Sequence, residues 1–569
     1  MENEQGSSPI GIKGIVLIVS MGVVAACGLC YEYLISTYAG YTRGSAFKEV
    51  FLIITLMMFA MGIGTLITQK LERNLLEWFI GLEMLIALIG GISILFISWG
   101  NAVAGYLPQL LTQVLVGSNG TQVGRGVLFD SLFFERLSGL ISYSPYVVGM
   151  IIGILVGMEI PLAIRILDSY RVQLKRSVSY VLSADYMGAL LGGLVWIMIF
   201  IAMPLTKAGF ILGLVNGGVA LVCLAFFFKE IKLRKTFLVA NIVIIAGLFL
   251  GFSRSADWEV KMEQLLYSDK VIYTAQTPYQ RMVITEWKAG KEIVNDFFIN
   301  GNLQMSSRDE YRYHELLVHP AILLSGIRHS VLILGGGDGL AAREVLKYPS
   351  VRKVVLVDID KELTNIFTEI QYVNGWMVNK HLLELNRYSL SDPRVQVVNR
   401  DAYIWLDETS TIFDVIIIDF PDPNHIELNK LYSWGFYKKL QRHLSANGFI
   451  AIQATSPVHS REAFLSIGKT MRAAGLRIIP YHANIPSFGE WGWYLAWNNG
   501  RWSVHNIREQ LAAISDKDIT FETKYLTPDV IKAVQLFGRG ELDDRHIKVN
   551  YRSDPQLISY YEKGWKEDY

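Results

Sequence analysis

A series of long apolar runs fills the chain from its beginning to about Ser253, and this feature constrains the fold more than any other. A helix that crosses a bilayer needs about 20 mostly apolar residues. The first run lacks a strongly basic start and is followed by further runs, so we do not interpret it as a signal peptide. Seven spans are predicted: Gly14–Ile35, Val50–Ile67, Leu75–Ile97, Ser144–Ile166, Ala184–Met203, Gly209–Phe228 and Phe237–Phe252.

Composition after Asp257 is that of an ordinary globular protein, so the 51% hydrophobic content of the chain reflects its first half. A net charge of +1 gives no basic footprint of the kind that nucleic-acid binding requires. The three cysteines, Cys27, Cys30 and Cys223, all lie in the apolar half. The ten histidines follow residue 313 without metal-ligand spacing, so we expect no metal and no nucleic-acid partner.

Acidic residues interrupt several predicted spans, at Glu32, Glu83, Glu159 and Asp185. A carboxylate in hydrocarbon is costly, and by default it suggests a functional site. In one interpretation these acids bond to Tyr, Ser or small-residue backbones at tight helix contacts. In the other they line a polar path for a cation, and both interpretations remain open.

Short alternating strands are predicted between Tyr267 and Asn300, with a turn at Ala289–Gly290 and a helix at Asp309–Leu324 after them. This pattern indicates a small β-domain in front of a larger α/β domain. We therefore predict three domains: a polytopic transmembrane domain (1–256), a small β-domain (257–318), and an α/β domain with C-terminal helices (319–569).

The stretch VLILGGGDGLAAREVLKYPSVRKVVLVDID begins at Val331 and predicts a buried parallel strand, a glycine turn, a helix and a second strand. Gly335 and Gly337 permit the tight turn and the close backbone approach that a nucleotide requires. The pattern is typical of a Rossmann-like, doubly wound sheet, in which ligands bind at the carboxyl ends of the strands.

Four acids follow four predicted strands, at Asp338, Asp358, Asp401 and Asp419. Asp358 lies about 20 residues beyond the glycines, where an acid accepts hydrogen bonds from ribose hydroxyls. Asp338 places a negative charge where a dinucleotide pyrophosphate would sit, which a phosphate site avoids. The pattern therefore favours an adenosyl sulfonium compound that carries an amine, although acids in such positions also simply cap helices.

Several motifs between about Leu266 and Trp497 resemble those of the spermidine/spermine synthase family, the polyamine aminopropyltransferases. In chain order they read YQRMVI, DEYRYHE, LILGGGDGLAAREVLKYPSVRKVVLVDID, RDA, DVIIIDFPDP and LYSWGFY. The apolar half, with CGLCYEY, MGIGT and GMEIPL, is similar to that of the long, membrane-embedded bacterial branch. The resemblance implies a class I methyltransferase-like α/β fold behind the membrane helices.

The resemblance also implies a role for each matching residue on the nucleoside side. Gln280 would contact the nucleoside, and Asp358 would hold the ribose hydroxyls. Asp401 and Ala402 occupy the place of the family's Asp-Gly pair that addresses the adenine.

On the amine side, the resemblance implies that Asp338 grips the amine of the aminopropyl chain. Tyr313 and His314 would face the polyamine acceptor, and Asp422 would fix the acceptor amine. Asp419 would accept the proton from the attacking amine, which is protonated in solution at neutral pH.

The implied reaction is aminopropyl transfer from decarboxylated S-adenosylmethionine, as co-substrate and without a cofactor, to an acceptor that is usually putrescine. The products would be spermidine and methylthioadenosine, and members of the family usually form homo-oligomers. Two departures from the family pattern fall near the site: the loop NHIELNK at Asn424–Lys430, and Phe488, which lacks the hydroxyl of the family's usual tyrosine.

Two alternatives and one question of location remain open. An S-adenosylmethionine-dependent methyltransferase shares this sheet and nucleoside edge, and a transporter or sensor could bind polyamines without turning them over. The lipid bilayer is an expected partner in each case. Lys and Arg cluster in three loops that the positive-inside rule makes cytoplasmic, which with seven spans places the second half outside. Cytosolic substrates instead place that half in the cytoplasm.

Overall fold

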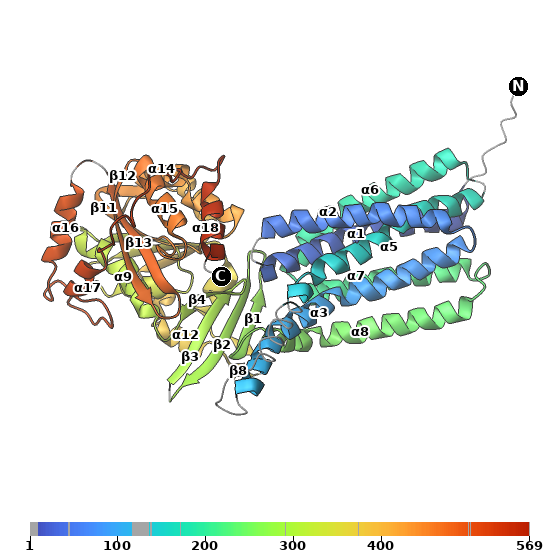
Figure 1. The fold of residues 1–569 in the computed structure, drawn as a ribbon, viewed down its shortest axis with the longest axis horizontal. Coiled ribbons are helices and arrows are strands. Elements are labelled where there is room, and N and C mark those ends of the chain that lie inside the picture. The colour runs from blue at the N-terminus through green and yellow to red at the C-terminus, as the bar shows by residue number, and fades with distance from the viewer. Residues whose placement is uncertain are drawn as a thin grey trace, which may run out of the picture. The chain divides into compact units, whose positions relative to one another are not determined.

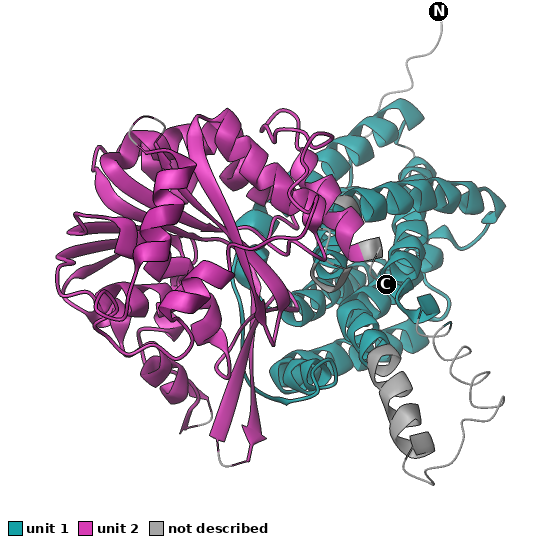
Figure 2. Cartoon of the chain, turned by 60° about the vertical axis from the view of Figure 1, so that its left-hand side comes forward, with its two compact units in different colours: residues 1–278 teal, residues 279–569 magenta. Residues whose placement is uncertain are grey.

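The computed structural model describes residues 10–43, 46–116, 136, 139–170, 172–290, 292–373, 375–498, 500 and 502–567. The chain divides into two compact units, residues 1–278 and 279–569 (Figure 2). The division expected from composition, with boundaries after residues 256 and 318, stays a prediction.

Long helices build the first unit (Figure 1). Seven of the described helices are long and apolar enough to cross a membrane, which confirms the predicted number of spans. The elements are α1 (Ile12–Arg43), α2 (Ala46–Ile67), η1 (Thr68–Lys70), α3 (Leu75–Val116), α5 (Ser144–Ser169), α6 (Leu174–Met198), η2 (Phe200–Ala202), α7 (Leu205–Phe227), α8 (Arg234–Gln264) and the strand β1 (Lys270–Gln276).

Glycine makes the closest helix crossings of this unit possible. A Cβ atom at Gly157 of α5 would lie 2.1 Å from the carbonyl oxygen of Met61 on α2. A Cβ atom at Gly188 of α6 would lie 2.0 Å from the carbonyl oxygen of Gly22 on α1. Any side chain at either glycine would push the helices apart, so the backbones meet through the small-residue packing that membrane helices favour.

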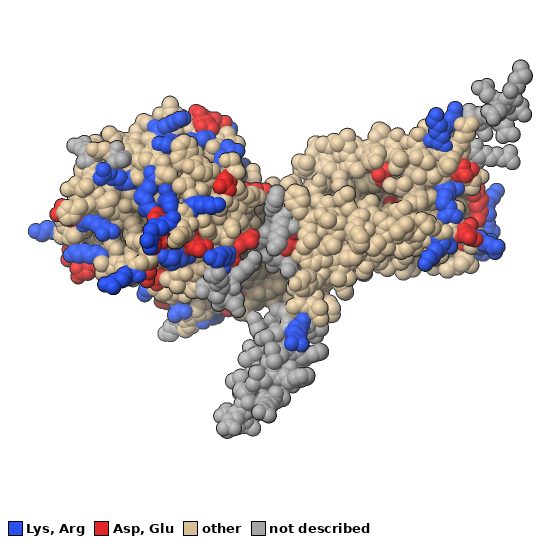
Figure 3. Space-filling view, turned by 45° about the horizontal axis from the view of Figure 1, so that its top comes forward, with Lys and Arg blue, Asp and Glu red and all other residues tan. Residues whose placement is uncertain are grey.

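The sides of the helices present apolar side chains, and Leu190, Ile197 and Val243 are among those exposed. On the face that Figure 3 shows, Lys, Arg, Asp and Glu of the helical unit gather mainly toward one end of the helices. Such a surface is suited to contact with lipid tails, because exposure of so many apolar side chains to water would be unfavourable.

Two of the acids within the spans are fully inside the helical unit. Glu83 of α3 is 0% exposed and Glu159 of α5 is 1% exposed, whereas Glu32 and Asp185 are only partly buried. The side chains of Glu83 on α3 and Glu159 on α5 share a hydrogen bond, and no other donor among the described residues reaches the carboxylate oxygens of Glu83. At this position the acid does bond to a neighbouring helix, but through a second acid and not through a Tyr, a Ser or a small-residue backbone.

The second unit begins with an antiparallel sheet of three consecutive strands, β2 (Arg281–Ala289), β3 (Glu292–Ile299) and β4 (Asn302–Ser306). The turn between β2 and β3 contains Gly290 at φ +67°, which is the predicted turn position. The helix α9 (Glu310–Leu324) follows and confirms the helix predicted there.

A seven-stranded sheet forms the centre of the second unit, in the order β12-β13-β11-β10-β5-β6-β9. Strands β9, β6, β5, β10 and β11 run parallel, whereas β13 is antiparallel to both β11 and β12. The α/β arrangement confirms the predicted fold class. The strands are β5 (Ser330–Gly335), β6 (Lys353–Asp358), β9 (Val395–Asn399), β10 (Phe413–Asp419), β11 (Leu444–Gln453), β12 (Leu476–Ile485) and β13 (Gly489–Asn498).

Helices alternate with these strands, and the apolar runs of β5, β6 and β10 are buried as expected for strands covered on both faces. The connecting elements are α10 (Leu340–Leu346), α11 (Lys361–Ile366), the hairpin β7 (Tyr372–Val373) and β8 (Trp376–Met377), α12 (Lys380–Leu385), η3 (Ser389–Ser391), α13 (Ala402–Glu408), η4 (Ile426–Tyr432), α14 (Trp434–His443), α15 (Arg461–Ala473), α16 (Val504–Ala513), α17 (Pro528–Ala533) and α18 (Gln556–Glu567).

Candidate active site

The sheet has its topological switch point between β5 and β10. From β5 the chain builds β6 and β9 on one side, and then β10 and β11 on the other. Gly335 at the end of β5 is the register partner of Asp419 at the end of β10. Ligands of doubly wound sheets bind where the strand order reverses, so this edge is the expected site.

The glycine turn brings the backbone against the acids of the neighbouring strands. Gly335 has φ +80°, and a Cβ atom there would lie 2.2 Å from the carbonyl oxygen of Asp419. At Gly337 a Cβ atom would lie 2.8 Å from the Oδ2 atom of Asp358. Space therefore favours glycine at both predicted positions, and at Gly335 the positive φ requires it as well.

Asp419 lies at the carboxyl end of β10 and is held by α9. The Tyr313 hydroxyl donates a hydrogen bond of 2.6 Å to its Oδ1 atom, and the Nε2 atom of His314 lies 4.0 Å from Oδ2. Burial raises the pKa of Asp419 to about 6, although the charge of His314 and the bond from Tyr313 act in the opposite direction. The carboxyl group is therefore ionised at neutral pH, with a proton affinity above that of an exposed aspartate.

His314 carries a positive charge at neutral pH. Its Nδ1 atom lies 2.9 Å from the Oε2 atom of Glu310 and 2.8 Å from the carbonyl oxygen of the same residue. Burial opposes protonation, but the hydrogen bond with Glu310 and the charges of Asp338, Glu310 and Asp419 outweigh it and raise the pKa to about 9.

Asp338 completes this cluster from the turn after β5. Its Oδ1 atom accepts a 2.9 Å hydrogen bond from the amide of Leu340, and burial raises its pKa. One ligand-type atom each of His314, Asp338 and Asp419 lies within 4.8 Å of the others, a spacing that could hold a metal ion. A metal would first have to displace the proton of His314, whereas an ammonium or sulfonium group could pair directly with the two carboxylates.

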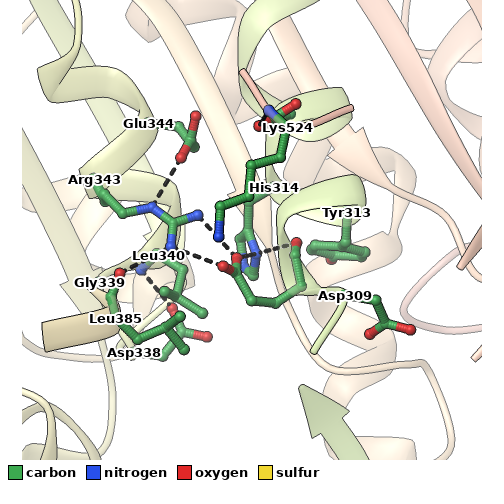
Figure 4. Close-up of polar contacts among 12 residues, drawn as sticks. Asp309, Tyr313, His314, Asp338, Gly339, Leu340, Arg343, Glu344, Leu385 and Lys524 are labelled. Carbon is green, nitrogen blue, oxygen red and sulfur yellow. Dashed lines mark hydrogen bonds and ion pairs between the residues drawn. The ribbon is translucent and has the colours of Figure 1, made fainter. Parts of the chain in front are cut away.

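A buried ion-pair network behind the cluster was not predicted. Both oxygens of Glu310 pair with the guanidinium of Arg343 on α10, at 2.8 and 2.9 Å, and Arg343 also donates to Glu344 (Figure 4). Glu310 and His314 are spaced i, i+4 on one helix, a spacing at which side chains meet and which could have indicated this pair from sequence. The partner Arg343 gave no such signal.

On the other side of the switch point, Asp358 ends β6. Its Oδ1 atom accepts from the amide of Asp360 at 2.9 Å, and burial raises its pKa to about 7. The Gln280 side chain donates a 2.9 Å hydrogen bond to the Oδ2 atom of Asp360. The structure thus brings two predicted nucleoside contacts, Gln280 and Asp358, to the same strand end.

The remaining nucleoside residues lie at the start of α13. Asp401 caps this helix by accepting a 2.8 Å hydrogen bond from the amide of Tyr403, and it also forms an ion pair with Lys430. Ala402 is buried at the first position of the helix. Lys430 belongs to the loop that departs from the family pattern, so this loop is tied to the predicted adenine side of the site.

Asp422 lies just beyond β10 and accepts three hydrogen bonds. Its Oδ2 atom accepts from the hydroxyls of Tyr561, at 2.9 Å, and Thr455, at 3.2 Å. Gln453 donates to Oδ1 at 3.5 Å. Burial raises the pKa of Asp422 to about 6, and these three hydrogen bonds counteract part of that effect. None of the three donors was predicted from the sequence.

Phe488, the second departure, lies between β12 and β13. Its ring contacts that of Tyr313 edge to face, with the centroids 6.1 Å apart. The side chain thus supports the tyrosine that binds Asp419, but it has no polar atom to offer a ligand.

Comparisons with known proteins agree with this geometry. The Spermine/spermidine synthase domain matches residues 310–507. A polyamine aminopropyltransferase of Leptospira interrogans is 36% identical over 556 residues, which are 96% of this chain and 98% of that relative. A polyamine aminopropyltransferase of Oceanobacillus iheyensis is 36% identical over 559 residues, covering 97% and 98% of the two chains.

Among solved structures, the spermidine synthase of Thermotoga maritima is similar over 48% of this chain and 87% of its own, with 26% identity and a TM-score of 0.40. The sequence relatives, in contrast, match the chain along nearly its whole length, helical unit included. A chain that shares both units with these proteins is an enzyme of the polyamine aminopropyltransferase family.

Proposed function

We propose that this enzyme transfers the aminopropyl group of decarboxylated S-adenosylmethionine to putrescine, releasing spermidine and methylthioadenosine. The observation that carries the proposal is the half-buried arrangement of Asp338, Asp419 and Asp422 around the end of β10. Both substrates are cationic, and closely placed carboxylates are the groups that attract and orient them.

Asp419 acts as the base in this proposal. Removal from water lowers the pKa of the acceptor's ammonium group, while burial raises the pKa of Asp419 to about 6. The two pKa values therefore approach each other, and the proton can move from the amine to Asp419. The amine nitrogen then forms a bond to the aminopropyl carbon, the carbon–sulfur bond breaks, and its electron pair goes to sulfur. The proton from nitrogen goes to Asp419.

The other residues hold the reactants in line, and alignment contributes much of the rate because the sulfonium is already a good leaving group. Asp358 binds the ribose hydroxyls and Gln280 contacts the nucleoside, while Asp401 and Ala402 address the adenine. Asp338 pairs with the amine of the aminopropyl arm.

The acceptor lies, in this proposal, between two groups. Tyr313 and His314 form one side, and Asp422 holds the amine on the other.

The bilayer anchors the enzyme through its seven helices, and we propose a homo-oligomer with its catalytic unit in the cytoplasm, where both substrates are made.

The test uses the full-length enzyme in detergent, with each of the two sulfonium nucleosides offered to a panel of diamines. Mass spectrometry should detect methylthioadenosine that depends on decarboxylated S-adenosylmethionine and on an added amine, with putrescine the best acceptor. Adenosylhomocysteine made from intact S-adenosylmethionine would instead indicate methyl transfer and overturn the proposal.

A further inference from the structure

The helix α18 contributes a side chain to the amine side of the site. From sequence, this helix is expected only to cover the sheet. In the structure, the hydroxyl of Tyr561 donates a 2.9 Å hydrogen bond to Asp422, although the two residues are 139 positions apart. None of the predicted motifs includes this residue.

The helix that carries Tyr561 is fixed in place. Leu557 is fully buried, and the rings of Trp565 and His459 stack with their centroids 5.4 Å apart. A Cβ atom at Gly564 would lie 2.5 Å from the carbonyl oxygen of His459, so the helix lies directly against that backbone. Tyr561 therefore reaches Asp422 from a rigid support.

The hydrogen bonds at Asp422 are divided unequally between its two oxygens. Oδ2 accepts from both Tyr561 and Thr455, at 2.9 and 3.2 Å. Oδ1 has a single contact with Gln453 at 3.5 Å, whose amide makes shorter bonds of 2.6 and 2.8 Å elsewhere. A carboxylate oxygen has two lone pairs, so Oδ1 retains capacity for a further donor.

We infer that Tyr561 is a positioning residue for the acceptor: it fixes the carboxylate of Asp422 through Oδ2, so that Oδ1 receives a protonated primary amine. The inference rests on the proposed function, because it takes the acceptor to be an amine bound by Asp422. Phe488, which packs on Tyr313, offers the acceptor no polar atom, so the orientation of Asp422 controls how the amine is held.

The test is Tyr561→Phe in the full-length enzyme, with initial rates measured against both substrates. A hydrogen bond to a charged group is worth enough to raise the KM for the acceptor amine by about tenfold to a hundredfold. The KM for decarboxylated S-adenosylmethionine should change by less than about twofold, because Asp422 is proposed to bind the acceptor and not this substrate. Tyr560→Phe is the matched control, because the Tyr560 hydroxyl accepts from the amide of Lys548 and not from the site.

A pH profile separates positioning from a merely structural role. The titratable groups that interact with Asp422 are Tyr561, Tyr432 and Tyr313. The hydroxyl of Tyr561 lowers the pKa of Asp422, so its removal should move the acid limb of kcat/KM for the acceptor to higher pH. Loss of helix packing alone would reduce stability without moving this limb.

Calorimetric binding of putrescine, in the presence of methylthioadenosine, distinguishes failure of this inference from failure of the proposed function. If the unmodified enzyme binds the amine more tightly than Tyr561→Phe but makes no spermidine, the positioning role stands and the proposed reaction falls. An unchanged acceptor KM and acid limb in an active Tyr561→Phe enzyme would overturn the inference. If that variant does not fold, Thr455→Val removes the other donor to Oδ2 and should produce the same two shifts.

Discussion

Glu310 and Glu83 are both buried glutamates within helices, one in each unit, and their surroundings differ completely. Glu310 pairs through both oxygens with Arg343 and also contacts His314. Glu83 is 0% exposed, and it shares a hydrogen bond with another buried acid, Glu159, while no further donor among the described residues reaches its oxygens. The catalytic unit thus compensates its buried charge with a cation, which fixes the cluster in one arrangement, whereas in the helical unit Glu83 meets a second acid instead of a cation.

The largest expected effect is that of a substitution at Asp419, the proposed base, which lies beside the ion pairs of Glu310. Asp419→Asn keeps the shape of the side chain but removes the proton acceptor. We expect kcat to fall by about a thousandfold, within the range for loss of a general base. Stopped assays of methylthioadenosine formation measure the change, and Asp414→Asn, at the other end of the same strand, serves as a control. A loss below tenfold would assign the proton to another acceptor.

Glu310→Gln tests how much the ion pair with Arg343 contributes to the stability of the catalytic unit. The substitution leaves Arg343 with a buried, incompletely paired charge, so we expect the free energy of unfolding of the catalytic unit to fall by about 3 kcal/mol. It also removes the main group that raises the pKa of His314. Chemical denaturation followed by tryptophan fluorescence would report the loss, and an unchanged midpoint would show that the ion pair adds nothing to stability.

The pH dependence of kcat/KM reports the same network in the unmodified, ligand-free enzyme. Asp419, with a pKa of about 6, must be ionised, so activity should be lost as pH falls through about 6. His314, with a pKa of about 9, supports the cluster when protonated, so activity should decline as pH rises through about 9. In Glu310→Gln the alkaline limb should move to lower pH, and an alkaline limb that stays in place would remove His314 from this role.

The same substitution in the helical unit, Glu83→Gln, should have the smallest effect and the opposite sign. An amide costs less than a carboxylate in an apolar interior, so we expect the helical unit to gain about 1 kcal/mol. The activity should stay within about twofold, because Glu83 belongs to the helical unit and is not among the residues proposed for the site. Thermal unfolding in detergent measures the gain. A loss of stability would mean that Glu83 binds something that compensates its charge, and cation dependence of that stability would then identify a cation site.

The features of the site that were predictable from sequence are those written in local patterns. Apolar runs indicated the seven helices, and a strand followed by glycines and an acid placed Asp338 and Asp419 at one sheet edge. Parallel strands bring their carboxyl ends to the same edge of the sheet, independently of the lengths of the loops between them. Four acids that are distant in sequence could therefore be assigned to that edge.

The partners that orient those acids were not predictable in the same way. Thr455 and Tyr561 reach Asp422 from a loop and from a late helix, and no periodicity in either segment marks the contact. In the sequence, Arg343 resembles any exposed helical residue. It is buried because α9 packs against α10, which the sequence pattern does not show. Such contacts depend on tertiary geometry, which a local pattern does not contain.

The glycine crossings and apolar sides of the helical unit also affect how the two units respond to heat. Helices that associate in lipid transfer apolar surface from lipid to protein rather than from water, so their separation adds little to the heat capacity of unfolding. The second unit buries its apolar strands away from water and should contribute about 4 kcal/mol/K for a domain of its length. Cooling would therefore weaken the catalytic unit through the hydrophobic term, while contacts such as Gly157 against Met61 keep nearly constant strength.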